Sequence, residues 1–199
     1  MFAFSTVLLL AGLAARAALV AGFVPFLVLN APPEGLAGVL FPVWVTPFTS
    51  TLVHDSFLPL AINLVILAIA GRLIERPLGR WGVVALYVLG AYVAAAAEWA
   101  AWPDMPIPIT GASGATSAVL GASAILFSRM QVRAIGPLSK RLIEALWLGV
   151  AWTVLQALPA LAYGLSMTGV LQQIAGNVAG FVLGMILVRP LLLWRYRGA

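Results

Sequence analysis

Residues 51–73 read TLVHDSFLPLAINLVILAIAGRL, an apolar run of about the length that crosses a lipid bilayer. A transmembrane helix needs roughly 20 mostly apolar residues. The end of this run overlaps a basic segment, RLIERPLGR, at residues 72–80. Similar runs recur along the chain, in which 63% of the residues are hydrophobic and 9% are charged. That composition lies far outside the range of soluble globular domains, so we expect a polytopic membrane protein.

Proline, glycine and charge clusters divide the 199 residues into six predicted helices. They cover residues 5–29, 51–73, 81–101, 113–127, 141–162 and 167–187. At roughly 20 residues per span, only short loops remain, and there is no room for a further soluble domain. We therefore expect an all-α membrane protein in which residues 1–199 form a single six-helix domain with an outer loop at about residues 30–50.

The first apolar run resembles a signal peptide, but it has no basic residue before it and is longer than a cleavable hydrophobic region. It is therefore predicted to be the first helix, with Arg16 towards its inner end. The following loop is rich in proline and aromatic residues, which favours either a functional loop or an ordinary aromatic anchor in the headgroup layer.

The cations sort into alternate loops. They are Arg72, Arg76, Arg80, Arg129, Arg133, Lys140, Arg141, Arg189, Arg195 and Arg197. The intervening loops at 30–50, 102–112 and 164–166 contain no Lys or Arg, so the positive-inside rule predicts that both termini are cytoplasmic. Orientation explains the net charge of +5; the expected surroundings are a lipid bilayer, in a bacterial plasma membrane, and no nucleic-acid partner is expected.

The sequence contains no cysteine, which excludes disulfides, thiol nucleophiles and zinc–thiolate sites. Polar residues within the predicted spans are the functional candidates because they are costly in a bilayer unless they are paired. They are His54, Asp55, Ser56, Asn63, Glu98, Ser113, Thr116, Ser117, Gln156, Gln172, Gln173 and Asn177. Since the inward ones are mainly amides and hydroxyls, no metal or organic cofactor is expected.

The segment Gly111-Ala112-Ser113-Gly114 lies where an uncharged loop turns into an apolar helix. The free N–H groups and positive end of a helix favour a developing oxyanion, and glycine lets a peptide approach closely. Ser113 is therefore a candidate nucleophile with Gly111 and Gly114 beside it. The alternative is a helix contact made of small residues, which is common in membranes.

The last predicted helix carries Gly176, Gly180 and Gly184 at a spacing of four, a pattern that lets another helix come very close. Asn177 lies beside this stripe, and Asn63 lies about halfway down the second helix. The serine, the glycine stripe and the two asparagines together indicate one polar site in the interior.

Over most of its length, from about Phe41 to Arg189, the chain resembles the rhomboid family of intramembrane serine proteases. The residues that carry the resemblance are His54 and Asn63, then Gly71, Glu75 and Gly79, then Gly111, Ser113, Gly114 and Gly121, and finally Asn177, Gly180 and Gly184. The resemblance implies a six-helix fold, Ser113 as the nucleophile and Asn63 on the oxyanion side.

Two departures from the family pattern fall on the chemistry. Asn177 stands where the family has its catalytic histidine, and Pro59 stands where it has an oxyanion histidine. A carboxamide can hydrogen-bond the Ser113 hydroxyl but cannot take its proton near neutral pH. Proline offers no donor, and Pro59 is expected to kink the second helix by freeing the carbonyl of Asp55.

His54 is the only histidine, so it is the one imidazole that could replace the missing base. Nine helical residues separate it from Asn63, roughly 13 Å, which places it at the outer mouth. Its alternative role is to anchor the outer loop.

Glu98 has two interpretations as well, a carboxylate that reaches the membrane interface or a member of a proton relay.

Four hypotheses follow. The first is a rhomboid-like pseudoprotease that binds transmembrane segments of other proteins around Ser113. The second is an active endopeptidase with Ser113 as nucleophile and His54 as an unconventional base. In the third, Asn177 was introduced in place of the catalytic residue in order to trap substrates. The second departure from the family pattern, at Pro59, fits this hypothesis poorly. A transporter or channel would need intramembrane charges or a repeat, and neither is evident.

Overall fold

A computed structural model of the chain describes residues 2–35, 38–127, 139–162 and 167–197. Its helices are α1 (Phe2–Leu10), α2 (Ala14–Ala21), α3 (Thr46–Thr49), α4 (Phe57–Ala101), α5 (Ser113–Phe127), α6 (Lys140–Ala162) and α7 (Met167–Arg195), with short 3₁₀ turns η1 (Pro25–Val28) and η2 (Ser50–Leu52). No strand occurs in the described ranges, so the all-α class is confirmed. Arg129, Arg133 and the predicted loop at 164–166 lie outside these residues.

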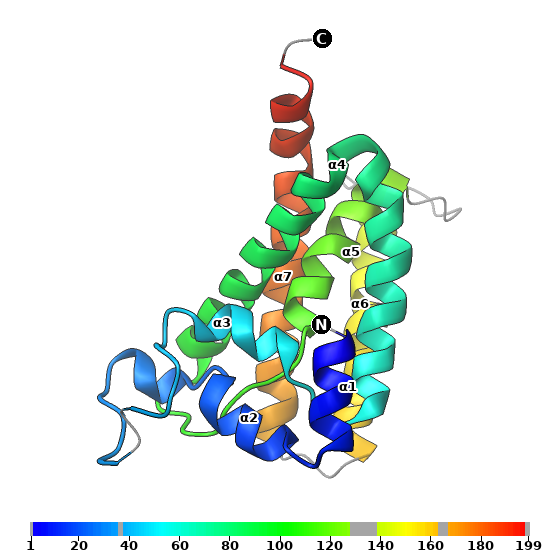
Figure 1. Cartoon of the computed structure of the whole chain (residues 1–199). Coiled ribbons are helices and arrows are strands. Elements are labelled where there is room, and N and C mark those ends of the chain that lie inside the picture. The colour runs from blue at the N-terminus through cyan, green and yellow to red at the C-terminus, as the bar shows by residue number, and fades with distance from the viewer. Residues whose placement is uncertain (1, 36–37, 128–138, 163–166, 198–199) are drawn as a thin grey trace.

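The longest helix, α4, consists of two arms that meet at Gly79 (Figure 1). Gly79 has φ 74°, a left-handed conformation that glycine adopts without a steric penalty. The arms Phe57–Leu78 and Arg80–Ala101 each hold 22 of the 45 residues, which is roughly 33 Å of helix and enough to cross a bilayer. The predicted loop at residues 74–80 is wrong, because the first arm stays helical up to Gly79.

Two helices of the described residues, α4 and α7, are long and apolar enough to span a membrane. α7 ends at Arg195, beyond the predicted end at residue 187, and it contains Pro190. Shorter apolar helices are α5, with the predicted bounds, and Leu142–Leu158 within α6. The count of six spans is not established by these helices.

The prediction of one helix over residues 5–29 is wrong. The N-terminal segment forms α1 and α2, which are separated at Gly12, and then the turn η1, which begins at Pro25. Gly12 has φ 68°, a conformation that ends a helix rather than continuing it. Arg16 therefore lies on α2, at the end of the bundle opposite the end of α7 (Figure 1).

The second predicted helix starts six residues late. Residues 46–52 form α3 and η2, and the chain is extended at Val53 and Ser56 before α4 begins at Phe57. Pro59 is therefore the third residue of α4, in the first turn, where a backbone N–H has no helical partner to lose. The predicted kink at Pro59 is wrong for this reason.

The centre of the bundle is α5, which packs against α4, α6 and α7 (Figure 1). Every residue from Gly114 to Ala124 is buried. Three glycines make the packing with α7 possible: a Cβ at Gly180 would collide with the Gly114 carbonyl, one at Gly184 with the Ala118 carbonyl, and one at Gly121 with the Phe181 carbonyl. The small-residue stripe predicted on α7 is thus a backbone-to-backbone helix crossing.

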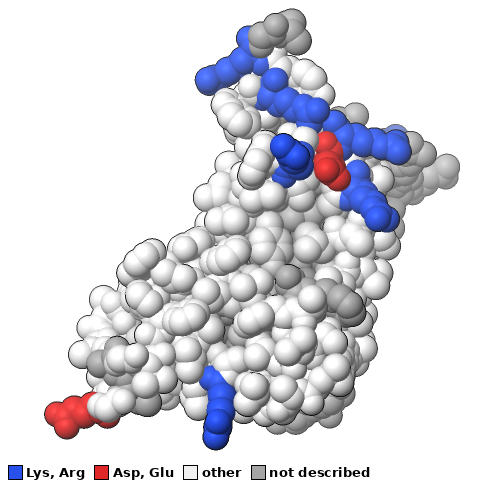
Figure 2. Space-filling view, viewed as in Figure 1, with Lys and Arg blue, Asp and Glu red and all other residues white. Residues whose placement is uncertain are grey.

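Charged side chains are unevenly distributed. Figure 2 shows most of the visible Lys and Arg side chains gathered at the end of the molecule where α7 terminates. We call this the cationic end, and the opposite end, where α4 and α7 begin, the cavity end. Two segments close over the cavity end: Phe23 and Ile109 exchange backbone hydrogen bonds of 3.0 and 2.7 Å.

Candidate functional site

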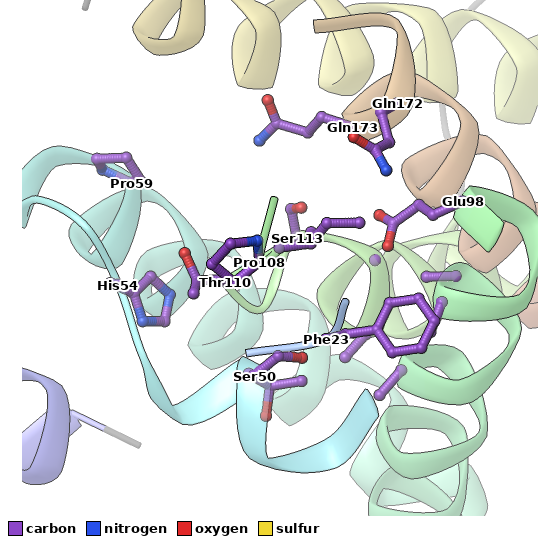
Figure 3. A pocket seen from close by; sticks show the side chains of 18 of the residues that line it. Phe23, Ser50, His54, Pro59, Glu98, Pro108, Thr110, Ser113, Gln172 and Gln173 are labelled. Atoms are coloured by element: carbon purple, nitrogen blue, oxygen red, sulfur yellow. The ribbon is translucent and has the colours of Figure 1, made fainter. Parts of the chain in front are cut away.

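A cavity of about 450 Å³ lies at the cavity end of the bundle (Figure 3). It is lined by the segment before α4, both arms of α4, the loop before α5, the first turn of α5 and the first turns of α7. Its polar lining comprises Ser50, Thr51, His54, Asp55, Ser56, Asn63, Glu98, Thr110, Ser113, Gln156, Gln172 and Gln173. The volume falls within the range of ligand-binding sites.

Ser113 is the first residue of α5, and its half-buried side chain lines the cavity. The loop reaches it through Gly111, which has φ 105° and whose N–H donates to the Ser50 carbonyl at 3.0 Å. The Ser113 carbonyl accepts a 2.7 Å hydrogen bond from Ser117 Oγ, which in turn accepts one of 2.6 Å from the Trp152 indole. The geometry presents the Ser113 hydroxyl at a helix N-terminus.

Asn177 is not among the residues that line the cavity. It is 1% exposed, and neither its amide nitrogen nor its amide oxygen has a hydrogen-bond partner in the structure. The predicted hydrogen bond between Asn177 and the Ser113 hydroxyl is therefore not formed. Gly114 does meet this part of α7, since a Cβ added at Gly114 would lie 3.5 Å from the Gly176 carbonyl oxygen.

A chain of hydrogen bonds joins four segments on the other side of the cavity. Ser5 Oγ donates to the Leu52 carbonyl at 2.6 Å and lies 3.1 Å from His54 Nδ1. Because a hydroxyl has one proton, His54 Nδ1 must donate to Ser5, which leaves Nε2 as an acceptor. Asn63 Nδ2 donates to that Nε2 at 3.4 Å, and Gln156 Nε2 donates to Asn63 Oδ1 at 2.8 Å.

This chain engages both ring nitrogens of His54, and the structure records no hydrogen bond between the imidazole and the Ser113 hydroxyl. The ring is 2% exposed, and burial lowers the pKa of His54 to about 4, so the imidazole is neutral at pH 7. The predicted separation of 13 Å from Asn63 is wrong, because residues 53–56 are not helical and bring His54 back against α4. His54 ties the segment before α4 to α1 and α4.

Glu98 does not reach the membrane interface. It is 8% exposed, lines the cavity, and places a carboxylate oxygen against the α-carbon of Gly176 on α7. Gln172, one turn earlier on α7, is 5% exposed, and its Nε2 has no hydrogen-bond partner. Figure 3 shows Glu98, Gln172 and Gln173 around the same space as Ser113. The interfacial interpretation of Glu98 is wrong.

The Rhomboid domain family model matches residues 42–193 of the chain. The chain belongs to the rhomboid family. No curated protein and no solved structure gives a significant match. Membership of this family, together with the apolar helices α4 and α7, makes the chain an integral membrane protein.

Within the rhomboid domain, Ser113, Asn63 and His54 all line the cavity. Asn177 does not line it. Pro59 also lines the cavity, on the side of His54 (Figure 3). No group of three His, Cys, Asp or Glu side chains that could hold a metal ion occurs within the described part of the chain.

Sequence reasoning missed the inward direction of Glu98 and the roles of Ser5 and Trp152. A signal for Glu98 exists: Ala91, Ala94, Ala95 and Glu98 follow the 3–4 spacing of one helical face, and all four line the cavity. A run of small residues that ends in a carboxylate marks a face that packs closely with its neighbours, so the carboxylate is buried with it.

Proposed function

We propose that this rhomboid-family protein binds transmembrane segments of other membrane proteins in the cavity beside Ser113, and that its peptidase activity is lost or severely reduced. The observation that carries the proposal is the absence of a proton acceptor at Ser113. The only imidazole in the sequence has both ring nitrogens engaged by Ser5 and Asn63, and Asn177 is an amide. Loss of one member of a serine protease's catalytic unit costs on the order of 10⁶ in rate.

The cavity supports the binding part of the proposal. It lies among helices α4, α5 and α7, its lining mixes small apolar residues with amides and hydroxyls, and it has room for a few side chains. Polar groups at membrane depth are expensive when unpaired, and a bound segment whose backbone is locally unwound supplies both donors and acceptors.

The test is to incubate the detergent-purified protein with a transmembrane substrate whose helix is weakened by Gly and Pro, and separately with a fluorophosphonate probe. We expect no cleavage above that of S113A and no labelling of Ser113, while the substrate still co-purifies with the protein. S123A is the matched control, because Ser123 is buried on the same helix and donates to the Leu120 carbonyl away from the cavity. Cleavage that S113A abolishes and S123A retains would contradict the proposal.

An active endopeptidase is the second candidate, and one observation favours it. Ser113 keeps the geometry of a nucleophile: a half-buried hydroxyl at the first residue of α5 that lines a cavity. In that case His54 would act as the unconventional base and Asn63 would contribute on the oxyanion side. The same labelling experiment separates the two candidates.

The proposal includes orientation. The bend of α4 at Gly79 and the end of α7 would face the cytoplasm of a bacterial cell and the cavity end would face outside, in line with the positive-inside rule. Because the chain has no cysteine, E34C and R76C give unambiguous accessibility probes. We expect a membrane-impermeant maleimide to label E34C in intact cells and R76C only after permeabilisation.

Six spans with both termini in the cytoplasm are part of this proposal, and α1 is the segment that decides it. Its nine residues extend roughly 14 Å, which is about half of a bilayer core. A reporter that is active only in the cytoplasm, fused to the N-terminus, is expected to be active. An inactive reporter would indicate an odd number of spans.

A further inference from the structure

The cavity carries acidic groups and lacks basic ones. Its lining contains Asp55 and Glu98 but no Lys or Arg. Asp55 is exposed at the rim, where it accepts a 2.9 Å hydrogen bond from the Thr110 hydroxyl. Of the described Lys and Arg residues, Arg16 is the one that lies towards the cavity end rather than on the loop and helix ends at the cationic end. The lining therefore offers acidic groups to a ligand and no basic group that would neutralise them.

Glu98 is the unusual member of this lining because nothing in the described structure compensates it. The structure records no hydrogen bond and no ion pair to its carboxyl among the described residues, and the residue is only 8% exposed. Buried carboxylates are normally paired, since an isolated charge in a medium of low dielectric constant is very unfavourable. A partner from outside the chain is the missing element.

Gln172 is an independent indication of a ligand at the same place. Its Nε2 is a buried donor without an acceptor, and it lies on α7 one turn before Gly176, against which the Glu98 carboxylate packs. A free amide donor needs a carbonyl oxygen, and a free carboxylate needs a cation or another donor. Both groups point into the cavity that contains Ser113 (Figure 3).

We infer that the cavity selects transmembrane segments that carry a Lys or Arg, with Glu98 as the counter-ion of the basic side chain and Gln172 as the donor to a backbone carbonyl of the segment. This inference rests on the proposed binding function and adds the chemistry of the partner. Glu98 lies three residues before Ala101, the end of α4, which is about 4.5 Å along the helix axis. The basic residue of the partner therefore lies about one helical turn inside the end of its apolar stretch.

The experiment uses the full chain in proteoliposomes with a photo-crosslinking amino acid in place of Ile107, which lines the cavity and is 62% exposed. Two synthetic transmembrane peptides serve as probes. They are alike except for one position, one turn inside the end of the apolar stretch, which is Lys in one peptide and Leu in the other. We expect the Lys peptide to be crosslinked about tenfold more than the Leu peptide, since close charge pairs discriminate strongly.

The variant E98Q is expected to reduce crosslinking of the Lys peptide to the level of the Leu peptide. E144Q is the matched control, because Glu144 is 6% exposed on α6 and does not line the cavity, and it is expected to retain the tenfold preference. An unchanged thermal midpoint of E98Q confirms that it is folded. As a second test of the ion pair, E98K is expected to prefer a peptide with Glu at the same position.

The outcomes separate the two proposals. Equal crosslinking of the Lys and Leu peptides by the unaltered protein would overturn the selection by Glu98 and leave the binding of transmembrane segments intact. Preference for Lys that persists in E98Q would also overturn it, because the preference would then come from another group. Crosslinking to neither peptide would overturn the proposed function together with this inference.

Discussion

The two sides of the cavity differ in how their larger polar side chains are satisfied. On one side, Ser5, His54, Asn63 and Gln156 form a continuous chain in which each side chain has a partner. On the other side, the Gln172 amide nitrogen has no partner, and neither does the whole amide of Asn177, which lies on α7 outside the cavity lining. No hydrogen bond to the Glu98 carboxyl is recorded among the described residues.

This difference distinguishes polar side chains that stabilise the fold from polar side chains that are available to a ligand. A chain of satisfied hydrogen bonds stabilises a folded state, because removal of one member leaves its partners buried and unpaired. Unpaired buried groups destabilise the fold, and a ligand that supplies their partner would remove that cost. In this rhomboid-family protein, the side that contains Asn63, the satisfied side, holds the fold together, and the side that contains Gln172, the open side, has donors and acceptors to spare.

The largest effect is expected for N63L, which breaks the satisfied side at its centre. The substitution leaves His54 Nε2 and Gln156 Nε2 without partners. An unsatisfied buried group costs about 1–3 kcal/mol, so we expect a loss of about 4 kcal/mol in the free energy of unfolding. The measurement is reversible unfolding in mixed micelles. A loss below about 1 kcal/mol would show that the chain is not structurally important.

N177H gives the open side the base that it lacks. Asn177 lies next to Gly176, whose carbonyl approaches Gly114, the residue after Ser113. General base catalysis contributes about 10²–10⁴ in rate, so we expect fluorophosphonate labelling of Ser113 to rise about 100-fold. The double variant N177H/S113A is the control and must not be labelled. Without an increase, the orientation of α7 or the replacement at Pro59 would be a further defect.

The satisfied side is also expected to be sensitive to acid through His54. Burial lowers the pKa of the folded state to about 4 from 6.5, so protons bind preferentially to the unfolded chain. Stability is therefore complete above about pH 6.5, falls as the pH decreases towards 4, and does not fall further below that value. Between pH 7 and pH 5 we expect a loss of about 2 kcal/mol.

The comparison is between the unaltered protein and H54Q, which removes the only histidine. We expect H54Q to be less stable than the unaltered protein at pH 7, and its free energy of unfolding to change by less between pH 7 and pH 5. Equal slopes for the two proteins between pH 7 and pH 5 would contradict a buried neutral imidazole.

The smallest effect is expected for N177L, the same exchange as N63L on the open side. Asn177 has no hydrogen-bond partner to leave unpaired, and leucine has a similar volume without the cost of a buried amide. We expect stability to be unchanged or to rise by about 1 kcal/mol in the same unfolding experiment. A loss comparable to that of N63L would remove the distinction between the two sides.

The sequence predicted those parts of the fold that depend on apolar length. The bounds of α5 are as predicted, and α6 begins one residue early. The breaks were harder to predict, because hydropathy does not report backbone conformation. The left-handed Gly12 divides the N-terminal run, while Gly79 confines the expected loop to a single residue of α4.

The candidate site could be predicted in its composition but only partly in its arrangement. Ser113 was placed correctly in the cavity because a helix begins there. His54 and Glu98 were misplaced, since one depends on where α4 starts and the other on which face of α4 meets α7. Such directions are set by helix crossings, and the sequence encodes these only through the sizes of facing residues.

The backbone pairing of Phe23 with Ile109 affects how a transmembrane segment would enter the cavity. At Gly114 and Gly121, α5 is in contact with backbone or small side chains of its neighbours, so it cannot move closer to α4 or α7 there. Widening of the cavity mouth would then come from the two segments that contain Phe23 and Ile109, and the two backbone hydrogen bonds between these residues would have to break. Entry of a transmembrane segment would then depend on whether this pair of hydrogen bonds is broken. The rate of entry would be set by the opening of the two segments and not by movement of α5.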